Sequence, residues 1–169
     1  MKKIFSLVVM GFCIFAILSQ APAQNSVDET ARLTAVEGFV YGNVQKVGFR
    51  AFIFRRAICY NLGGLINNRE DGSVHFFLQG KKDLMDKALS AIRKGPAKAR
   101  VERVQFDNRP VENGLTSVIV KGWTSQSRNF RTPVDLVYNL RPDNSEIQES
   151  EVHRIYKNII QTAMGNAGI

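Results

Sequence analysis

The ten residues YGNVQKVGFR, Tyr41 to Arg50, lie between an apolar run and a stretch with helical periodicity. The run Leu33 to Gly42 is typical of a strand, because its second half is rich in β-branched and aromatic side chains. The stretch Arg50 to Tyr60 predicts a helix, followed by Asn61, a residue that tolerates the left-handed C-terminal cap. The ten residues therefore predict a basic, glycine-containing loop between a strand and a helix N-terminus.

Two strands, a second helix and further strands follow. Asp71-Gly72 between Leu62–Asn68 and Ser73–Gln79 predicts a β-hairpin. A helical pattern then runs from Lys81 until Gly95-Pro96 ends it, and its apolar positions are Leu84, Met85, Ala88, Leu89 and Ile92. Further strands are predicted around Val101, Val104 and Phe106 and at Val118 to Val120.

The order β-α-β-β-α-β, with a short extra strand, predicts an α+β fold. Its architecture would be the ferredoxin-like sandwich, in which an antiparallel sheet carries two helices on one face. This fold hosts many unrelated activities, so it names no function by itself.

The loop has the composition of an anion-binding site. Backbone N–H groups before a helix can converge on one point, and the helix dipole favours negative charge there. Gly48 lets the backbone approach a ligand closely, and Arg50 offers a planar fork of donors that fits two phosphate oxygens. A tight turn followed by a solvated arginine would contain the same residues, so the loop alone leaves both interpretations open.

Residues 42–50, GNVQKVGFR, resemble the signature loop of the acylphosphatase family. Further similarities to that family lie at Ala57, Leu62, Gly64, Asn68, Asp71-Gly72, Gly95-Pro96 and Ala99-Arg100-Val101. The similarity extends from about Leu33 to Trp123 and predicts an acylphosphatase-like domain at residues 32–123. It implies a metal-independent hydrolase that cleaves the carboxyl–phosphate bond of small-molecule acyl phosphates and needs no cofactor.

The resemblance also implies roles for individual residues. The phosphate-binding loop would consist of Gln45, Lys46, Val47, Gly48, Phe49 and Arg50. Arg50 would bind the phosphoryl group, and the Asn68 amide, which both donates and accepts hydrogen bonds, would orient the attacking water. Asn68 could instead simply begin the loop that contains Arg69.

Lys46 departs from the family pattern, which usually has glycine at this position. If the position requires a positive φ, a lysine there costs about 1 kcal/mol and could tilt an N–H group away from the phosphate. Alternatively, the lysine charge adds attraction for the anion. An exported phosphate- or anion-binding module with weak or no catalysis is therefore the alternative to an active acylphosphatase.

Residues 1–23 are predicted to be a bacterial secretory signal peptide. Lys2 and Lys3 precede the apolar run Ile4 to Leu18, and Ala21-Pro22-Ala23 supplies small residues for cleavage. An uncleaved membrane anchor is the alternative, but the apolar run is shorter than the roughly 20 residues that a span needs. We therefore expect a periplasmic or secreted protein without stable membrane association after cleavage.

Composition narrows the possible functions. The chain has 169 residues, 44% of them hydrophobic, a formal net charge of +8 and two cysteines. Signal cleavage removes Cys13, so Cys59 has no intramolecular partner and is predicted to be a small buried apolar residue. His75 and His153 lack partners at ligand spacing, so we expect no metal.

A basic protein can bind nucleic acid, but the aromatic RNA-binding strand motif is missing from this sequence and the export signal argues against nucleic-acid binding.

An extension, residues 124–169, follows the predicted domain. Pro133 to Tyr138 predicts a strand, and Ser145-Glu146-Ile147-Gln148 is a capping-box pattern that predicts an amphipathic helix at about 146–164. We expect this helix to pack on its own domain, with a partner-binding helix as the alternative.

The first helix provides a surface for that packing. Phe54 and Ile58, spaced i and i+4, form an apolar stripe on a face that a two-helix domain does not cover. We expect Val152, Ile155 and Ile159 of the extension to dock near this stripe. The contact would form in the same chain or in a dimer mate, so the protein is predicted to be a monomer or a homodimer.

Overall fold

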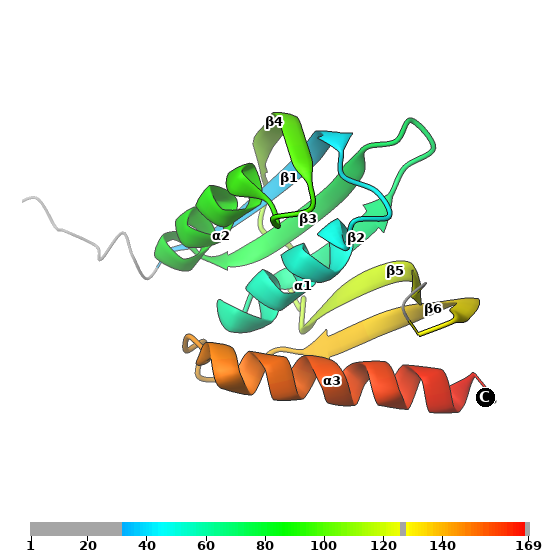
Figure 1. Cartoon of the computed structure of the whole chain (residues 1–169). Coiled ribbons are helices and arrows are strands. Elements are labelled where there is room, and N and C mark those ends of the chain that lie inside the picture. Colours follow the sequence, from blue (N-terminus) through cyan, green and yellow to red (C-terminus); the bar gives the residue numbers. More distant parts are fainter. Residues whose placement is uncertain (1–31, 126–127, 168–169) are drawn as a thin grey trace, which may run out of the picture.

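The structure, a computed structural model, describes residues 32–125 and 128–167. The predicted signal peptide, residues 1–23, lies outside the described residues. No helix within the described part of the chain is long and apolar enough to cross a membrane. In chain order the elements are β1 (Leu33–Asn43), α1 (Phe49–Cys59), β2 (Gly63–Asn68), β3 (Val74–Lys81), α2 (Lys82–Lys94), β4 (Arg100–Arg109), β5 (Ser117–Ser125), β6 (Phe130–Asn139) and α3 (Glu149–Asn166) (Figure 1).

Two tight turns direct the first half of the domain. After α1, Asn61 takes a left-handed φ of 50°, and the Leu62 N–H donates to the Ala57 carbonyl at 2.8 Å. The hairpin between β2 and β3 has a φ of 84° at Gly72, a conformation that glycine adopts without steric cost. The predicted left-handed residue after the helix, Asn61, and the predicted hairpin at Asp71-Gly72 are both confirmed, and the helix itself covers Phe49–Cys59 instead of the predicted Arg50 to Tyr60.

The strands form one six-stranded sheet in the order β4-β1-β3-β2-β5-β6. All neighbours pair antiparallel except β2 and β5, which run parallel with Ile66 opposite Val120. The expectation of an antiparallel sheet is wrong at this pair, because β5 reaches β2 by a long crossover instead of a hairpin. The α+β ferredoxin-like fold is confirmed, and β6 is an additional edge strand.

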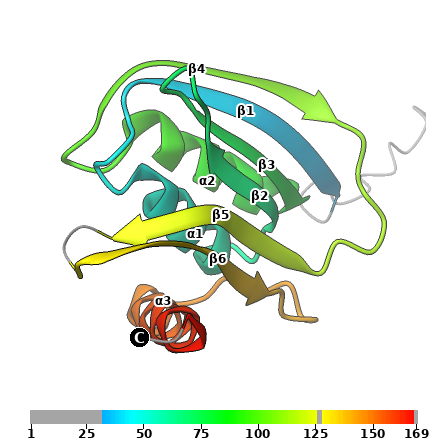
Figure 2. The same cartoon turned by 90° about the vertical axis from the view of Figure 1, so that its right-hand side faces the viewer.

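The core lies between the sheet and the helices. Figure 2 shows α1 and α2 on one face of the sheet, as the sequence predicts. Alternate residues of the central strands point into this layer, and Val36, Val74, Phe76 and Leu78 are fully or almost fully buried. The five apolar positions predicted for α2 are all buried. This packing fixes the ends of β1, β2 and β5 relative to the start of α1.

The extension completes the same core. β6 pairs with β5, and α3 packs against both β6 and α1 (Figure 1). Phe54 and Ile58 are fully buried, and the Phe54 ring centroid lies 6.3 Å from that of Tyr156 in an edge arrangement. The predicted docking of the extension on the stripe is confirmed within one chain, with contributions from Val152, Ile155 and Ile159.

The start of α3 differs from the prediction. The helix begins at Glu149, and no side chain caps it. Ser145 does not cap the helix, because its hydroxyl donates to Asp143 at 2.8 Å. Ile147 is buried, and its N–H donates to the Cys59 carbonyl at 2.7 Å. This tertiary contact keeps the chain non-helical through Ile147, which delays the helix beyond the capping-box pattern.

Candidate active site

The loop from β1 to α1 contains two left-handed residues. Lys46 has a φ of 61° and Gly48 a φ of 81°. Gly48 is the N-cap residue of α1, and its carbonyl accepts the Phe52 N–H at 3.0 Å. Val44, which is buried, anchors the start of the loop in the core. The loop therefore has a defined path into the first turn of α1.

The N-terminus of α1 has N–H donors that find no acceptor in residues 32–125 and 128–167. The N–H groups of a first helical turn have no partner within the helix. No side chain among the described residues caps them, and the first turn carries no acidic residue. A Cβ built on Gly48 would meet no atom within 4 Å, so the space beside the N-cap is open. Donors of this kind, together with the helix dipole, form a binding site for an anion.

Lys46 occupies the conformation in which a side chain is disfavoured. The sequence leaves open whether position 46 requires a positive φ, and the structure shows that Lys46 does take the left-handed conformation. The Lys46 side chain is exposed. The residue therefore carries local strain and also places a positive charge on the loop.

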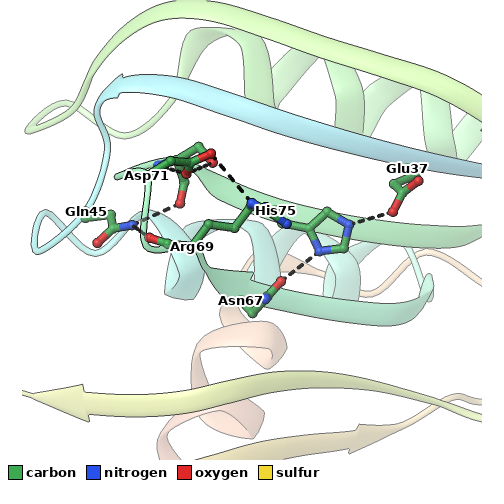
Figure 3. A network of polar contacts seen from close by, with 7 residues as sticks. Glu37, Gln45, Asn67, Arg69, Asp71 and His75 are labelled. Atoms are coloured by element: carbon green, nitrogen blue, oxygen red, sulfur yellow. Dashed lines mark hydrogen bonds and ion pairs between the residues drawn. The ribbon is translucent and has the colours of Figure 1, made fainter.

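Gln45 anchors the loop through its side chain. Its amide nitrogen donates to the carbonyls of Arg69 at 2.8 Å and Ser73 at 2.9 Å, which flank the β2–β3 turn (Figure 3). Asp71 stabilises the same turn by accepting the Ser73 N–H at 3.0 Å. The Gln45 side chain thus couples the β1–α1 loop to the hairpin that follows β2.

Arg50 lies on the first turn of α1 and is half-buried. Its Nη1 donates to the carbonyl of Lys121 at 2.6 Å and to that of Gly122 at 2.9 Å. Burial lowers the pKa of the Arg50 guanidinium from its ordinary value, yet a guanidinium remains cationic at physiological pH. Nε and Nη2 make no hydrogen bond within the described residues, so this edge of the fork can bind an anion.

Asn68 is the last residue of β2 and shares the helix-facing side of the strand with Ile66. Ile66 pairs with Val120, so the parallel register carries Asn68 toward Gly122, where Arg50 is bound. The Asn68 Oδ1 is buried and has no hydrogen-bond partner in the described structure. A buried acceptor without a hydrogen bond is unfavourable unless a water molecule or a ligand donates a hydrogen bond to it.

The sequence did not single out the carbonyls of Lys121 and Gly122. They lie where the β5–β6 register shifts, between Val120 and Trp123, and Gly122 has a φ of 58°. A glycine inside a strand pattern is a signal for such a bulge. The pattern around Gly122 could therefore have indicated the bulge, but not that its carbonyls face Arg50.

Other reactive side chains lie elsewhere. Cys59 is buried, its Sγ contacts the Ile147 carbonyl at 3.3 Å, and burial raises the pKa of its thiol, which confirms its prediction as a buried residue. His75 bonds to Asn67 and Glu37 on the face of the sheet opposite α1 and α2 (Figure 3). The described residues include no group of three or more His, Cys, Asp or Glu arranged to bind a metal ion.

Comparison with known proteins identifies relatives of the domain. The acylphosphatase family model matches residues 36–119. The acylphosphatase of Archaeoglobus fulgidus is 40% identical over 81 residues, which are 48% of this chain and 91% of that protein. The acylphosphatase of Burkholderia vietnamiensis is 41% identical over 90 residues, which are 53% of this chain and 90% of that protein.

The crystal structure of acylphosphatase from Bacillus subtilis is also similar, with 27% identity and a TM-score of 0.47 over 50% of this chain and 92% of that one. The range that the family model matches contains the β1–α1 loop, Arg50 and Asn68, and the matches to the Archaeoglobus and Burkholderia proteins cover nearly the full length of those relatives. The chain therefore belongs to the acylphosphatase family.

Proposed function

We propose that the protein is an acylphosphatase that hydrolyses acyl phosphates to a carboxylate and inorganic phosphate. The observation that supports this most strongly is the arrangement of three features at one end of the sheet. These are the uncapped start of α1, the tethered guanidinium of Arg50 and the unpaired Oδ1 of Asn68. In this proposal the phosphate site at Arg50 and the water site at Asn68 lie side by side.

In the binding step, the phosphoryl group lies at the start of α1. Backbone N–H groups of the loop and the free edge of Arg50 donate to its oxygens, and the loop residues are Gln45, Lys46, Val47, Gly48, Phe49 and Arg50. Two bonds from Nη1 fix the orientation of the guanidinium before the substrate arrives. Donors that are already oriented stabilise the charge of the transition state without a reorganisation cost.

In the chemical step, the Asn68 Oδ1 accepts a hydrogen bond from a water molecule and directs its oxygen at phosphorus. The new P–O bond forms as the bond to the carboxylate oxygen breaks, and that oxygen leaves with the electron pair. A carboxylate has a pKa of about 4, so it departs without a general acid. The proton of the water passes to phosphate or solvent, and positioning with charge stabilisation supplies the catalysis.

The test is a hydrolysis assay on the protein without residues 1–23, using several simple acyl phosphates. We expect rates well above those in buffer, no change in rate when EDTA is added, and poor turnover of phosphate monoesters, whose alkoxide leaving groups are stronger bases. If no acyl phosphate is hydrolysed faster than in buffer, the exported anion-binding module replaces this proposal.

We also propose that the protein acts in the periplasm or outside the cell. The support is the sequence of residues 1–23, in which lysines, an apolar run and a small-residue cleavage site follow one another. Fractionation of cells that express the full chain tests this, with N-terminal sequencing of the exported form. We expect export and a mature N-terminus at Gln24, and retention of the uncleaved chain in the membrane would contradict it.

A further inference from the structure

The acceptors that fix Arg50 belong to an irregular part of β5. The antiparallel register of β5 and β6 shifts between Val120 and Trp123, and Gly122 takes a left-handed φ of 58°. The bulge turns two successive carbonyls, those of Lys121 and Gly122, toward Arg50. A regular strand would direct successive carbonyls to opposite sides, so the binding of Arg50 depends on the bulge.

Asp135 of β6 binds this bulge from the other side. Its Oδ1 accepts the Gly122 N–H at 3.0 Å, and its Oδ2 accepts the Lys121 ammonium at 2.6 Å. These hydrogen bonds, first that from Lys121 and then that from the Gly122 N–H, lower the pKa of the Asp135 carboxyl from its ordinary value. The carboxylate is therefore ionised at neutral pH, and each of its two oxygens accepts one hydrogen bond from the bulge.

One peptide unit connects Asp135 to Arg50. The Lys121 carbonyl and the Gly122 N–H belong to the same peptide plane, and no peptide in the described structure is cis. In a trans peptide these two groups point in opposite directions. Asp135 accepts at the N–H end while Arg50 donates at the carbonyl end. A negative charge at the N–H end fixes the plane and polarises the carbonyl, which strengthens its bond to the guanidinium.

We propose that Asp135 is a positioning residue that orients the Arg50 guanidinium for phosphate through the Lys121–Gly122 peptide. Asp135 lies outside residues 36–119, the part that matches the family model. The extension thus contributes to the active site in addition to the core. This inference rests on the proposed function only for the kinetic effect, because phosphate binding by Arg50 can be measured without turnover.

The main test compares Asp135→Ala with Glu146→Ala. Glu146 also forms an ion pair between the extension and the domain, with Lys87 at 2.7 Å, and its side chain is 44% exposed against 40% for Asp135. Within the part of the chain that the structure describes, Glu146 makes its hydrogen bond and ion pair with Lys87 and none with Arg50, so it is a matched control. We expect Asp135→Ala to weaken inorganic phosphate binding and to lower kcat/KM by about tenfold, the loss of one charge-assisted contact. Glu146→Ala should leave both unchanged.

Two further variants separate positioning from stability. Asp135→Asn keeps an oxygen for the Gly122 N–H but lacks the negative charge, so it should restore part of the phosphate affinity that Asp135→Ala loses. In an Arg50→Ala background, Asp135→Ala should cause no further loss, because the residue acts through Arg50. Melting temperatures are measured for every variant. If Asp135→Ala does not fold, Asp135→Ser replaces it, because serine keeps a polar side chain that is shorter than that of aspartate.

The outcomes are distinguishable from those that test the proposed function. If no acyl phosphate is hydrolysed but Asp135→Ala still weakens phosphate binding, the activity is wrong and the positioning role stands. Wild-type phosphate affinity in folded Asp135→Ala would overturn the positioning role. The positioning role would also be overturned if Asp135→Ala lowered phosphate affinity equally in the wild-type protein and in the Arg50→Ala background.

Discussion

Arg50 and Asn68 contribute different interactions to the site. Arg50 carries a charge and donates two hydrogen bonds that hold it in place, whereas Asn68 offers a buried amide oxygen that has no hydrogen-bond partner in the described structure. Arg50→Ala should therefore weaken inorganic phosphate binding and lower turnover together. Asn68→Ala should lower kcat by about 100-fold or more while phosphate affinity stays close to wild type, because the amide orients the water in the proposed mechanism. Steady-state kinetics with phosphate as a competitive inhibitor measures both effects.

Asn67→Ala is the matched control for Asn68→Ala. Asn67 precedes Asn68 in β2, but its side chain bonds to His75 at 2.7 Å on the opposite face of the sheet. This control should leave kcat unchanged. Equal losses of phosphate affinity in Arg50→Ala and Asn68→Ala would contradict the division of roles.

The left-handed φ of Lys46 makes a prediction about stability. Lys46→Gly should raise the free energy of unfolding by about 1 kcal/mol, because glycine adopts a φ of 61° without steric cost. Lys46→Ala removes the same charge but keeps the strain, so it should not stabilise the protein. Chemical denaturation of both variants measures the difference. If the alanine variant gains as much stability as the glycine variant, charge and not strain explains the effect.

At the residue scale, the sequence proposes the site residues that the family motif contains. Arg50, Asn68 and the loop glycine can be proposed as site residues because their types and spacing are specific, and their roles remain predictions. Asp135 could not, because it acts through a peptide of another strand and depends on the β5–β6 register. Gln45 was assigned to the phosphate-binding loop, but hydrogen bonds to the hairpin determine the position of its side chain.

A polar network on the open face connects several strands. The Glu37 carboxylate of β1 accepts hydrogen bonds from Arg109 of β4. It also contacts Nε2 of His75 in β3 at 2.9 Å, and the other ring nitrogen of His75 contacts Asn67 of β2 (Figure 3). The bonds from Arg109 and then His75 lower the pKa of Glu37 from its ordinary value of 4.5. A lowered folded-state pKa means that ionised Glu37 stabilises the fold above about pH 4.5.

This stabilisation should be lost as the pH falls from about 4.5 through the lowered pKa of Glu37. Denaturant unfolding of the wild type and of Glu37→Gln across pH measures the effect. The two curves should converge in acid and separate above that range. Arg109→Ala should reduce the separation, because Arg109 provides the largest contribution. A stability difference that does not change with pH would contradict the assignment.

At the element scale, the sequence predicted the elements that have strong local signals. The hairpin at Asp71-Gly72 and the apolar spacing of α2 follow from turn chemistry and periodicity. The parallel pairing of β2 with β5 and the late start of α3 could not be derived locally. The β2–β5 pairing depends on the path of the crossover connection, and the start of α3 depends on the backbone hydrogen bond from Ile147 to Cys59.

The extension is part of the fold of the whole molecule. Truncation after Thr124 removes β6 and α3, which cover Phe54, Ile58 and the edge of β5. Each large apolar side chain that returns to water costs about 1.5 to 3 kcal/mol. We therefore expect the truncated protein to melt at a much lower temperature or to aggregate, as circular dichroism and light scattering would show.

Val152→Ala provides a milder version of this test, with the exposed Lys157→Ala on the same helix as its control. The alanine at 152 should lower the melting temperature, and the alanine at 157 should not. A truncated protein as stable and soluble as the longer chain would refute the structural role of the extension.

The central claim is that a water molecule attacks the phosphorus of an acyl phosphate bound at Arg50 and Asn68. The most direct measurement is hydrolysis in water enriched in the heavy oxygen isotope, followed by mass spectrometry of both products. The account predicts that the label appears in inorganic phosphate and not in the carboxylate, at a rate that Asn68→Ala lowers by about 100-fold or more. Label in the carboxylate, or release no faster than in buffer, would contradict it.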